Sequence, residues 1–321
     1  MKLRDPLSDI QQRLSPTALG IEIGAHALPI AGLNPIYVDC VKEYAGSASR
    51  VDILADARFL PFQSDSLDYL CSSHLLEHLP NPVAAILEWH RVLKPGGYLY
   101  LVVPDRNFTF DMTRKTTSVD HIICDFFDGV EQADESHISD FIYNSDWERL
   151  NPATSPELVP LERDRMMQAY LLELKAGWHV DIHYHTFTPA SLHAIFMECC
   201  LAGGFMACFD LLSSASRYPV ERGDGIGLLL RKRSGWKLNG KSSKTYLFHK
   251  GSFNLPLVCP CSLKPLEFHK KGTSGQLWCD GADKYNIDEG IPYLINRSLR
   301  SVRKWNNARY RKKFIKYGRF A

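Results

Sequence analysis

Short apolar runs alternate with turn-forming and helical stretches through the first third of the chain. The runs predict strands at residues 20–24, 33–39, 51–54, 67–72 and 98–103. Residues 82–93 instead repeat apolar side chains at the three- and four-residue spacing of a helix. Pro95, Gly96 and Gly97 follow this stretch, as proline and glycine usually follow a helix end. Strands that alternate with helices in this way predict a parallel sheet covered by helices.

The pattern changes after the fifth predicted strand. Residues 105–182 are polar and contain one helical pattern, at about 161–175. Ligands of open α/β sheets bind outside the carboxyl ends of the strands. We therefore expect this insertion to be a lid over a binding site. A helix at 191–201 and strands at 205–212 and 226–231 follow, which brings the sheet to seven strands.

Four parts are expected along the chain. They are a main domain (1–232), a basic linker (233–246), a small module (247–296) and a basic tail (297–321). The chain of 321 residues is 45% hydrophobic and 23% charged, as is ordinary for a soluble globular protein. Its net charge is only +2, yet the tail has ten Lys and Arg and no Asp or Glu. The tail is therefore a separate feature from the acidic remainder.

The location of the protein is predicted from three sequence features. No apolar run at the start suits a secretory signal, and no stretch approaches the ~20 uninterrupted apolar residues of a membrane-spanning helix. The nine cysteines are scattered, which fits free thiols better than a disulfide framework. We therefore expect a cytoplasmic protein without a transmembrane segment.

Acidic residues stand at or beside the ends of three predicted strands. Glu22 and Gly24 end the first strand, Asp39 ends the second, and Asp56 with Ala57 follows the third. The glycine allows a tight turn beside a ligand, and an acid after the second strand can accept hydrogen bonds from ribose hydroxyls. Together these positions predict a site for a nucleoside-containing cofactor.

These residues resemble, closely and in order, the class I methyltransferases that use S-adenosylmethionine, and more specifically the type 11 group of small-molecule and quinone-type methyltransferases. Glu77-His78-Leu79 and the stretch from Arg91 to Gly97 complete the resemblance. It implies an α/β, Rossmann-like, seven-stranded and mostly parallel sheet with an inserted lid and a small C-terminal α+β module. It also implies S-adenosylmethionine as the cofactor, held by Glu22, Gly24, Asp39, Asp56, Ala57 and Ser73. One departure is that His26 and Leu28 occupy positions where the family has glycines.

Histidines are the candidates for removing a proton from a hydroxyl acceptor, because their ordinary pKa suits a base at neutral pH. His74 and His78 follow the fourth predicted strand. His183 and His185 lie where the insertion returns to the sheet, and on an extended segment they would share one side with Asp181. We predict His183 or His185 as the general base, with His74 and His78 as the other candidates. A metal site and a polar face packed under the lid are the alternatives, and no metal ligand is assigned.

The acceptor is expected to be a small molecule or a glycan, methylated at oxygen. Residues 104–111 and the His-x-His segment are similar to methyltransferases of polysaccharide biosynthesis, which implies a glycan-type acceptor. Two other functions remain open. The first is RNA methylation; the second is a non-catalytic binding protein that keeps the fold, as the altered loop at His26 would allow.

The C-terminal quarter of the chain resembles the small zinc-ribbon-like domain that activates some methyltransferases. A ribbon needs four ligands. The module offers Cys259, Cys261 and Cys279, with His269 as the fourth candidate, so we expect a metal-depleted module. The basic tail carries interspersed aromatic residues, which suits an anionic membrane surface or nucleic acid. The alternative for the tail is a terminal helix that packs on the body.

Overall fold

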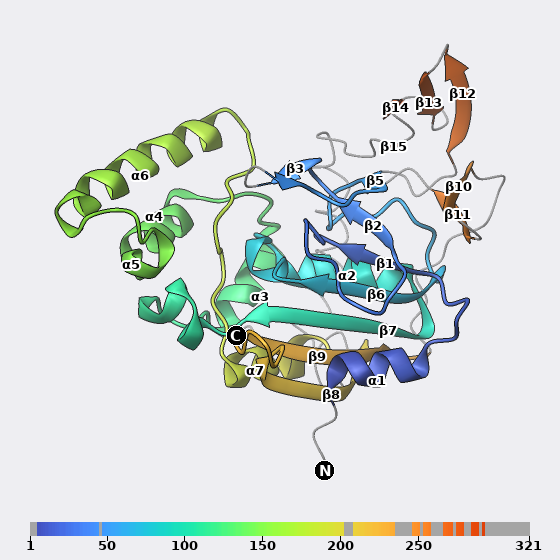
Figure 1. The fold of residues 1–321 in the computed structure, drawn as a ribbon, viewed down its shortest axis with the longest axis horizontal. Coiled ribbons are helices and arrows are strands. Elements are labelled where there is room, and N and C mark those ends of the chain that lie inside the picture. Colours follow the sequence, from blue (N-terminus) through green and yellow to red (C-terminus); the bar gives the residue numbers. More distant parts are fainter. Residues whose placement is uncertain are drawn as a thin grey trace.

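The computed structural model describes residues 5–44, 47–201 and 208–234, together with Leu266 and six short strands between 246 and 292. A seven-stranded sheet forms its centre, in the order β5-β2-β1-β6-β7-β9-β8 (Figure 1). The first five strands of this order pair in parallel, and β9 is antiparallel to both its neighbours. The predicted seven-stranded, mostly parallel sheet is thus confirmed. The strand bounds are β1 Gly20–Ile23, β2 Ile36–Asp39, β5 Ile53–Leu54, β6 Leu67–Ser73, β7 Leu93–Pro104, β8 Phe209–Tyr218 and β9 Gly225–Lys232.

Both faces of the sheet are buried, which explains why its strands are continuous apolar runs. On β7, Leu99 and Leu101 point into a core shared with α2 (Pro82–Val92), α3 (Val119–Asp128) and α7 (Pro189–Cys199). Tyr100 and Val102 point to the other face, where they meet α1 (Pro6–Arg13). Alternate side chains therefore anchor the two helical layers to one sheet.

The helix before β7 begins and ends as its sequence predicts. The Asn81 side chain accepts the N–H of Ala84 at 3.0 Å, which caps the first turn of α2. The helix ends at Val92, and β7 already begins at Leu93, so the predicted turn is part of the strand. Gly97 is required there, because a β-carbon would lie 2.9 Å from the carbonyl oxygen of Lys94.

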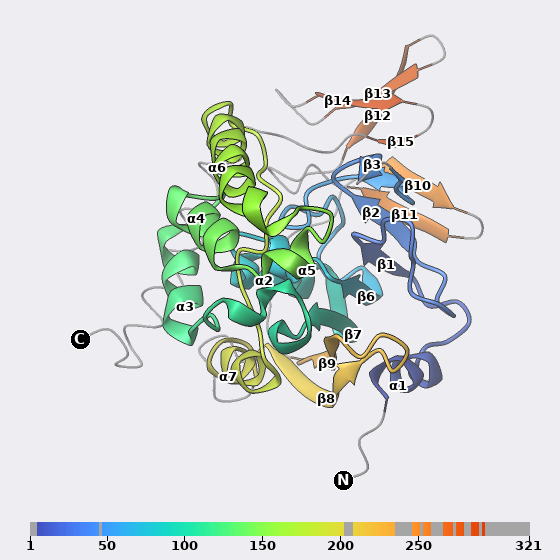
Figure 2. The same cartoon turned by 60° about the vertical axis from the view of Figure 1, so that its left-hand side comes forward.

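The insertion after β7 has more helices than its polar sequence predicts. It contains α3, α4 (Glu135–Asn144), α5 (Trp147–Leu150) and α6 (Val159–Lys175), with short 3-10 helices η2 (Arg106–Phe108), η3 (Phe110–Thr113) and η4 (Pro156–Leu158). A separate apolar cluster that includes Ile138, Trp147 and Tyr184 holds this part together. In Figures 1 and 2 the helices α4–α6 lie beyond the end to which β7 points.

Several C-terminal predictions fall outside the described residues. The described strands there are β10 (Tyr246–Lys250), β11 (Phe253–Leu257), β12 (Glu267–Lys271), β13 (Ser274–Trp278), β14 (Lys284–Asp288) and β15 (Ile291–Pro292). Leu257, Leu266 and Tyr285 join the main core. The predicted zinc-ribbon cysteines Cys259, Cys261 and Cys279 and the tail lie outside the described residues, and the side chain of His269 is not described. The metal content of the module and the role of the tail stay predictions.

Two smaller features complete the description. A pair of two-residue antiparallel strands, β3 (Glu43–Tyr44) and β4 (Ser47–Ala48), follows β2. Among the helices that the structure describes, none has the length and apolar character needed to span a membrane.

Candidate active site

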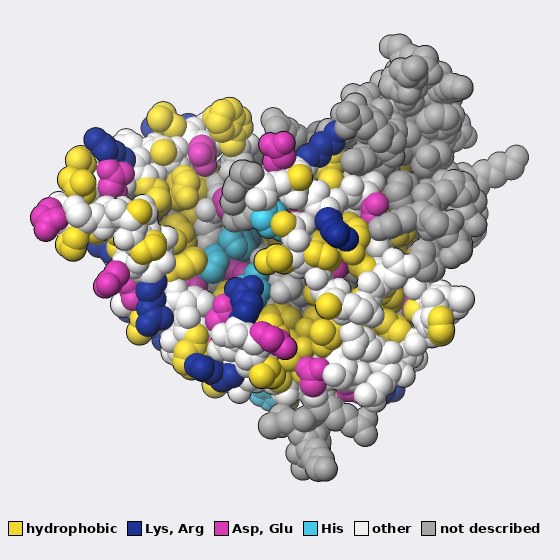
Figure 3. Space-filling model, viewed as in Figure 1, with side chains coloured by type: hydrophobic (Ala, Val, Ile, Leu, Met, Phe, Trp, Pro, Cys, Tyr) yellow, Lys and Arg dark blue, Asp and Glu magenta, His cyan; other side chains and the backbone are white. Residues whose placement is uncertain are grey.

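The carboxyl ends of the parallel strands meet at one edge of the sheet, and the predicted site residues gather there. Gly24 follows β1, Asp39 ends β2, Ser73 ends β6 and Asp105 follows β7. Figure 3 shows histidine side chains in a hollow between the insertion, on the left, and the sheet. The edge, the insertion and the histidines therefore enclose one candidate site.

The loop after β1 is held by the acid that precedes it. The carboxylate of Glu22 accepts the N–H of Ile30 at 3.0 and 3.2 Å, one distance for each oxygen. Burial raises the pKa of Glu22 to about 7, against the hydrogen bond from Ile30 and the charge of Arg50. Gly24 has φ +72°, and His26 also adopts a left-handed backbone, with φ +48°. The loop thus keeps a glycine-type conformation at His26, although a histidine has replaced the glycine.

Asp39 has one oxygen committed to its own turn. Its Oδ1 accepts the N–H of Cys40 at 2.7 Å and that of Val41 at 3.3 Å. Burial raises the pKa of Asp39, opposed by these hydrogen bonds. These two hydrogen bonds fix the direction in which the carboxylate points, and both of them end on Oδ1 and not on Oδ2.

Asp56 is engaged more fully than the sequence suggests. Arg58 donates from Nε to Oδ1 at 3.0 Å and from Nη2 to Oδ2 at 2.7 Å. Arg58 also donates to the carbonyl of Glu131 in the insertion. Ala57 is buried, and its carbonyl accepts from the indole of Trp89 at 2.9 Å. Asp56 thus links the sheet edge to the insertion through Arg58.

Ser73 and His74 follow the middle of the sheet. The hydroxyl of Ser73 lies 3.1 Å from Nδ1 of His74, and His74 has a left-handed backbone with φ +51°. Burial lowers the pKa of His74, and the nearby His183 and Arg222 lower it further. His74 is therefore a poorer proton acceptor than a solvent-exposed histidine.

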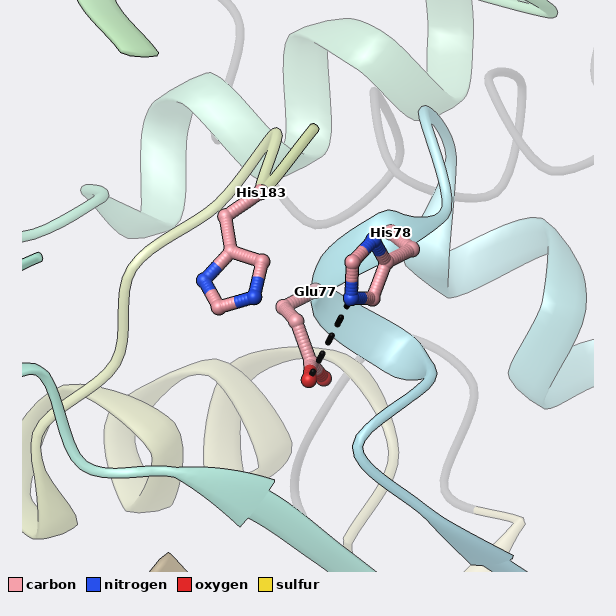
Figure 4. A group of neighbouring side chains, drawn as sticks. All are labelled: Glu77, His78 and His183. Atoms are coloured by element: carbon pink, nitrogen blue, oxygen red, sulfur yellow. Dashed lines mark ion pairs between the residues drawn. The ribbon is translucent and has the colours of Figure 1, made fainter. Parts of the chain in front are cut away.

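Three side chains form the centre of the site: Glu77 and His78 on η1 (Leu76–His78) and His183 on the returning segment (Figure 4). Nε2 of His78 lies 3.9 Å from a carboxylate oxygen of Glu77, and the two imidazole rings meet edge to face at 4.7 Å. Glu77 is fully buried, and neither of its oxygens has a hydrogen-bond partner among the described residues. One ligand atom from each residue lies within 4.8 Å of the others. The group could share a proton or a divalent cation.

Each of these histidines has a carboxylate behind it. Nδ1 of His183 donates to Oδ2 of Asp111 at 2.6 Å, and Nδ1 of His78 lies 2.8 Å from Oδ1 of Asp181. Arg114 binds the other oxygen of Asp111 at 2.7 Å. Burial alone would raise the pKa of Asp111, but His183 and Arg114 hold it below its ordinary value. The ionised Asp111 fixes His183 with its proton on Nδ1, which leaves Nε2 able to accept one.

His78 lies between two carboxylates. Burial by itself would lower the pKa of His78, but Asp181 and Glu77 outweigh it and raise the value. A positive charge on His78 is thus favoured, with Glu77 3.9 Å from its Nε2.

His185 does not join His183, contrary to the expectation that both would share one side. The segment between them is not a regular strand; its only bridge joins Phe187 to Asp105. Strand alternation therefore does not apply. His185 is fully buried, with Nε2 at 3.8 Å from Asp125. Burial and the neighbouring His121 and His137 lower its pKa well below the ordinary value, so His185 is a poor base.

Sequence reasoning missed the residues that the insertion contributes. Asp111 and Arg114 come from η3 and the residue after it, and Asp125 comes from α3. Asp111 ends the stretch 104–111 that was noted for its resemblance, which was the one signal available. The partnership with His183 spans 72 residues and cannot be read from local pattern.

Comparisons with known proteins match the part of the chain that runs from β1 into β7. Residues 19–101 match the family described as methyltransferase domain. The chain is 30% identical over 101 residues to the ubiquinone biosynthesis O-methyltransferase of Pseudomonas fluorescens, covering 32% of this chain and 40% of that protein. It is 39% identical over 57 residues to the demethylmenaquinone methyltransferase of Staphylococcus epidermidis, and this match covers 17% of this chain and 24% of that protein. The chain thus spans about 40% of the length of the first curated relatives it matches.

Solved structures that resemble this fold have lower sequence identity to the chain. One is a chain from the complex between the Haloferax volcanii Trm112 methyltransferase activator and a methyltransferase, with TM-score 0.36, 12% identity and coverage of 72% of this chain and 90% of that one. Another is a SAM-dependent methyltransferase from Methanosarcina mazei, with TM-score 0.36, 16% identity and coverage of 70% and 97%. Scores of this size carry no argument about function. The family match does, and residues 19–101 are a methyltransferase domain of the class I type, which uses S-adenosylmethionine.

Proposed function

We propose that the whole chain is an S-adenosylmethionine-dependent methyltransferase that methylates a hydroxyl oxygen of a small-molecule or glycan-type acceptor. The observation that carries the proposal is the pairing of His183 with Asp111, beside Glu77 and His78, at the carboxyl edge of the methyltransferase sheet. A hydroxyl acceptor needs such a base, because its proton must leave as the new bond forms.

The loop and the strand ends fit the cofactor. Left-handed backbone at Gly24 and His26 opens the turn after β1, and a β-carbon on Gly24 would still only touch Leu75, at 3.4 Å. Asp39 stands at the end of β2 with Oδ1 held by the turn, so that Oδ2 is the oxygen for ribose hydroxyls. S-adenosylmethionine, when bound, supplies a methyl group on a positively charged sulfur.

His183 takes the acceptor proton in this account. Its Nδ1 proton is held by Asp111, so the free lone pair is on Nε2. With the cofactor bound, the acceptor oxygen would bond to the methyl carbon as the carbon–sulfur bond breaks, and the hydroxyl proton would pass to Nε2 of His183. The resulting imidazolium is stabilised by Asp111 on one side and by the buried Glu77 on the other.

Two observations support oxygen as the methylated atom and a small acceptor. Relatives matched over 101 residues are named as ubiquinone biosynthesis O-methyltransferases. The hollow beside the histidines is bordered by the insertion, which contributes Asp111 and Asp181 to the site. The resemblance of residues 104–111 to methyltransferases of polysaccharide biosynthesis adds a glycan as the second acceptor class.

The test is methyl transfer from isotopically labelled S-adenosylmethionine to a panel of hydroxylated aromatic compounds and oligosaccharides, with total RNA as a further acceptor. The expected result is label on a hydroxyl oxygen of a small molecule or glycan, with one S-adenosylhomocysteine formed per methyl group. Label on RNA alone would favour the RNA alternative. Cofactor binding without transfer to any of these acceptors would favour the non-catalytic alternative and overturn the proposal.

A further inference from the structure

A second cluster of histidines lies between the insertion and the returning segment, apart from the site that holds His183. His121 and Asp125 stand four residues apart on α3 and so face the same side of that helix. His137 comes from the first turn of α4, and His185 from the segment that leads to α7. Three separate elements thus bring an imidazole or carboxylate to one point.

The spacing of three of these groups, His121, Asp125 and His185, suits the first shell of a metal ion, because one ligand atom from each lies within 4.8 Å of the others. Nε2 of His121 lies 3.3 Å from Oδ2 of Asp125 and 3.2 Å from Nε2 of His137. Nε2 of His185 lies 3.8 Å from the same Oδ2. In a tetrahedral zinc site with bonds of about 2.0–2.2 Å, neighbouring ligand atoms are about 3.3–3.6 Å apart. The measured distances bracket this range.

Two side chains of the cluster bury polar atoms that make no hydrogen bond with the described residues, although Oδ2 of Asp125 lies within ion-pair distance of His121. Oδ2 of Asp125 and both ring nitrogens of His185 have no hydrogen-bond partner in the part of the chain that the structure describes. Asp125 is 6% exposed and His185 fully buried, and leaving such groups unpaired is costly. A bound dication would satisfy Asp125 and His185 together.

The surroundings are those of a metal site as well. Asp134, the N-cap of α4, lies 2.9 Å from Nδ1 of His137 and can accept its proton, which leaves Nε2 free as a ligand. A carboxylate behind a ligating histidine is the usual second shell of zinc. His121 is 44% exposed, so the ion has a path from solvent.

We propose that His121, Asp125, His137 and His185 bind one transition-metal dication, and that zinc suits this set of three imidazoles and one carboxylate best. The ion would fasten α3 and α4 to the segment that carries His183, two residues before His185. Its role is to hold the insertion in place at the acceptor side. Metal binding does not depend on the proposed methyltransferase activity, so the two can fail separately.

The experiment titrates zinc into the metal-free full-length protein and compares three variants. Asp125→Asn and His185→Ala should each bind one equivalent of zinc fewer with high affinity than the unmodified protein does. The affinity for that zinc ion should fall by more than about 10–100-fold, which is the loss caused by removing a residue that only supports a ligand. His193→Ala, which removes an exposed histidine of α7, should bind as the unmodified protein does. Unchanged stoichiometry and affinity in the first two variants would overturn the proposal.

A second measurement uses the unmodified protein, in case a variant does not fold. Cobalt bound in place of zinc should give the visible absorption of a tetrahedral site. The spectrum should contain no thiolate-to-cobalt charge-transfer band, because the four proposed ligands include no cysteine. A cobalt spectrum with only the thiolate band would assign the metal to Cys259, Cys261 and Cys279 and overturn the proposal. Zinc should also slow backbone hydrogen exchange in α3 and α4. Equal exchange rates there with and without zinc would likewise contradict the proposed metal site.

Discussion

Nδ1 of His183 lies 2.6 Å from Oδ2 of Asp111, although 72 residues separate them along the chain. Asp111 comes from η3, at the start of the insertion, and His183 from the segment that ends it. Both ends of the insertion therefore meet at the edge of the sheet. The insertion therefore contributes side chains to the candidate active site.

Replacing His183 tests the proposed base. His183→Ala should lower turnover about 10²–10⁴-fold, the usual contribution of a general base, while cofactor affinity stays nearly constant. The measurement is initial rate with saturating acceptor, together with calorimetric binding of S-adenosylmethionine. His193→Ala is the control.

Other outcomes reassign the role. Unmodified turnover in His183→Ala would leave His74 or His78 as the better candidate. If activity of the unmodified protein disappears with a chelator and returns with a divalent cation, while Asp125→Asn keeps this behaviour, Glu77, His78 and His183 act as a metal site. Either outcome would remove His183 from the role of base.

Asp111 is a positioning residue, and two carboxylates that bind the same arginine allow a matched test. Asp111→Asn should lower kcat about 10²–10⁴-fold with little change in KM, because the amide no longer fixes the proton on Nδ1 of His183. Asp140→Asn removes the other, half-exposed partner of Arg114 and should leave kcat close to normal. An equal loss of kcat in the two variants would show that Asp111 acts only by anchoring Arg114 and not by orienting His183.

Glu22 predicts a pH dependence of stability. Its pKa is about 7 in the folded protein, against an ordinary value of 4.5, so the folded state holds the proton over this range and the unfolded state does not. The stabilisation is complete below about pH 4.5 and is lost as the pH rises to about 7. Across that interval the free energy of unfolding should fall by roughly 2–4 kcal/mol relative to Glu22→Gln, which does not ionise.

Denaturant unfolding of both proteins at several pH values measures this difference. The glutamine amide can still accept the N–H of Ile30, so the loop is retained in the variant. A constant difference in unfolding free energy between pH 4.5 and 7 would mean that Glu22 ionises as readily in the folded state as in the unfolded chain.

The insertion is expected to close over the acceptor. Limited proteolysis within residues 105–182 should slow when cofactor and acceptor are both bound, since the insertion contributes side chains to the site from Asp111 and Asp181. Cleavage in the main domain serves as the internal control. Equal cleavage of the insertion with and without ligands would count against closure.

The sheet was predictable from sequence because its strands are buried on both faces. Runs such as residues 98–103 are apolar throughout, and Pro95, Gly96 and Gly97 follow the end of the helix predicted at 82–93. Strand ends in turn place Gly24, Asp39 and Ser73 at one edge. The positions of these candidate residues therefore follow from local pattern and the rule that parallel strands share an edge.

The partners of the histidines were not predictable in this way. His121 and Asp125 share a face of α3, but the one helical pattern in the sequence of the insertion lies at about 161–175, so local pattern does not place this pair on a helix. Asp111 reaches His183, and Asp125 reaches His185, only through the tertiary fold. His183 and His185 separate into two clusters because their segment is irregular, which periodicity does not reveal.

Binding of S-adenosylmethionine tests the central claim most directly. Titration calorimetry should show one site, and Asp39→Ala should weaken binding by about 1–3 kcal/mol, as expected for loss of a hydrogen bond to a charged group. Absence of binding to the unmodified protein would contradict the account as a whole. Unchanged affinity in Asp39→Ala would contradict the placement of the cofactor at the end of β2.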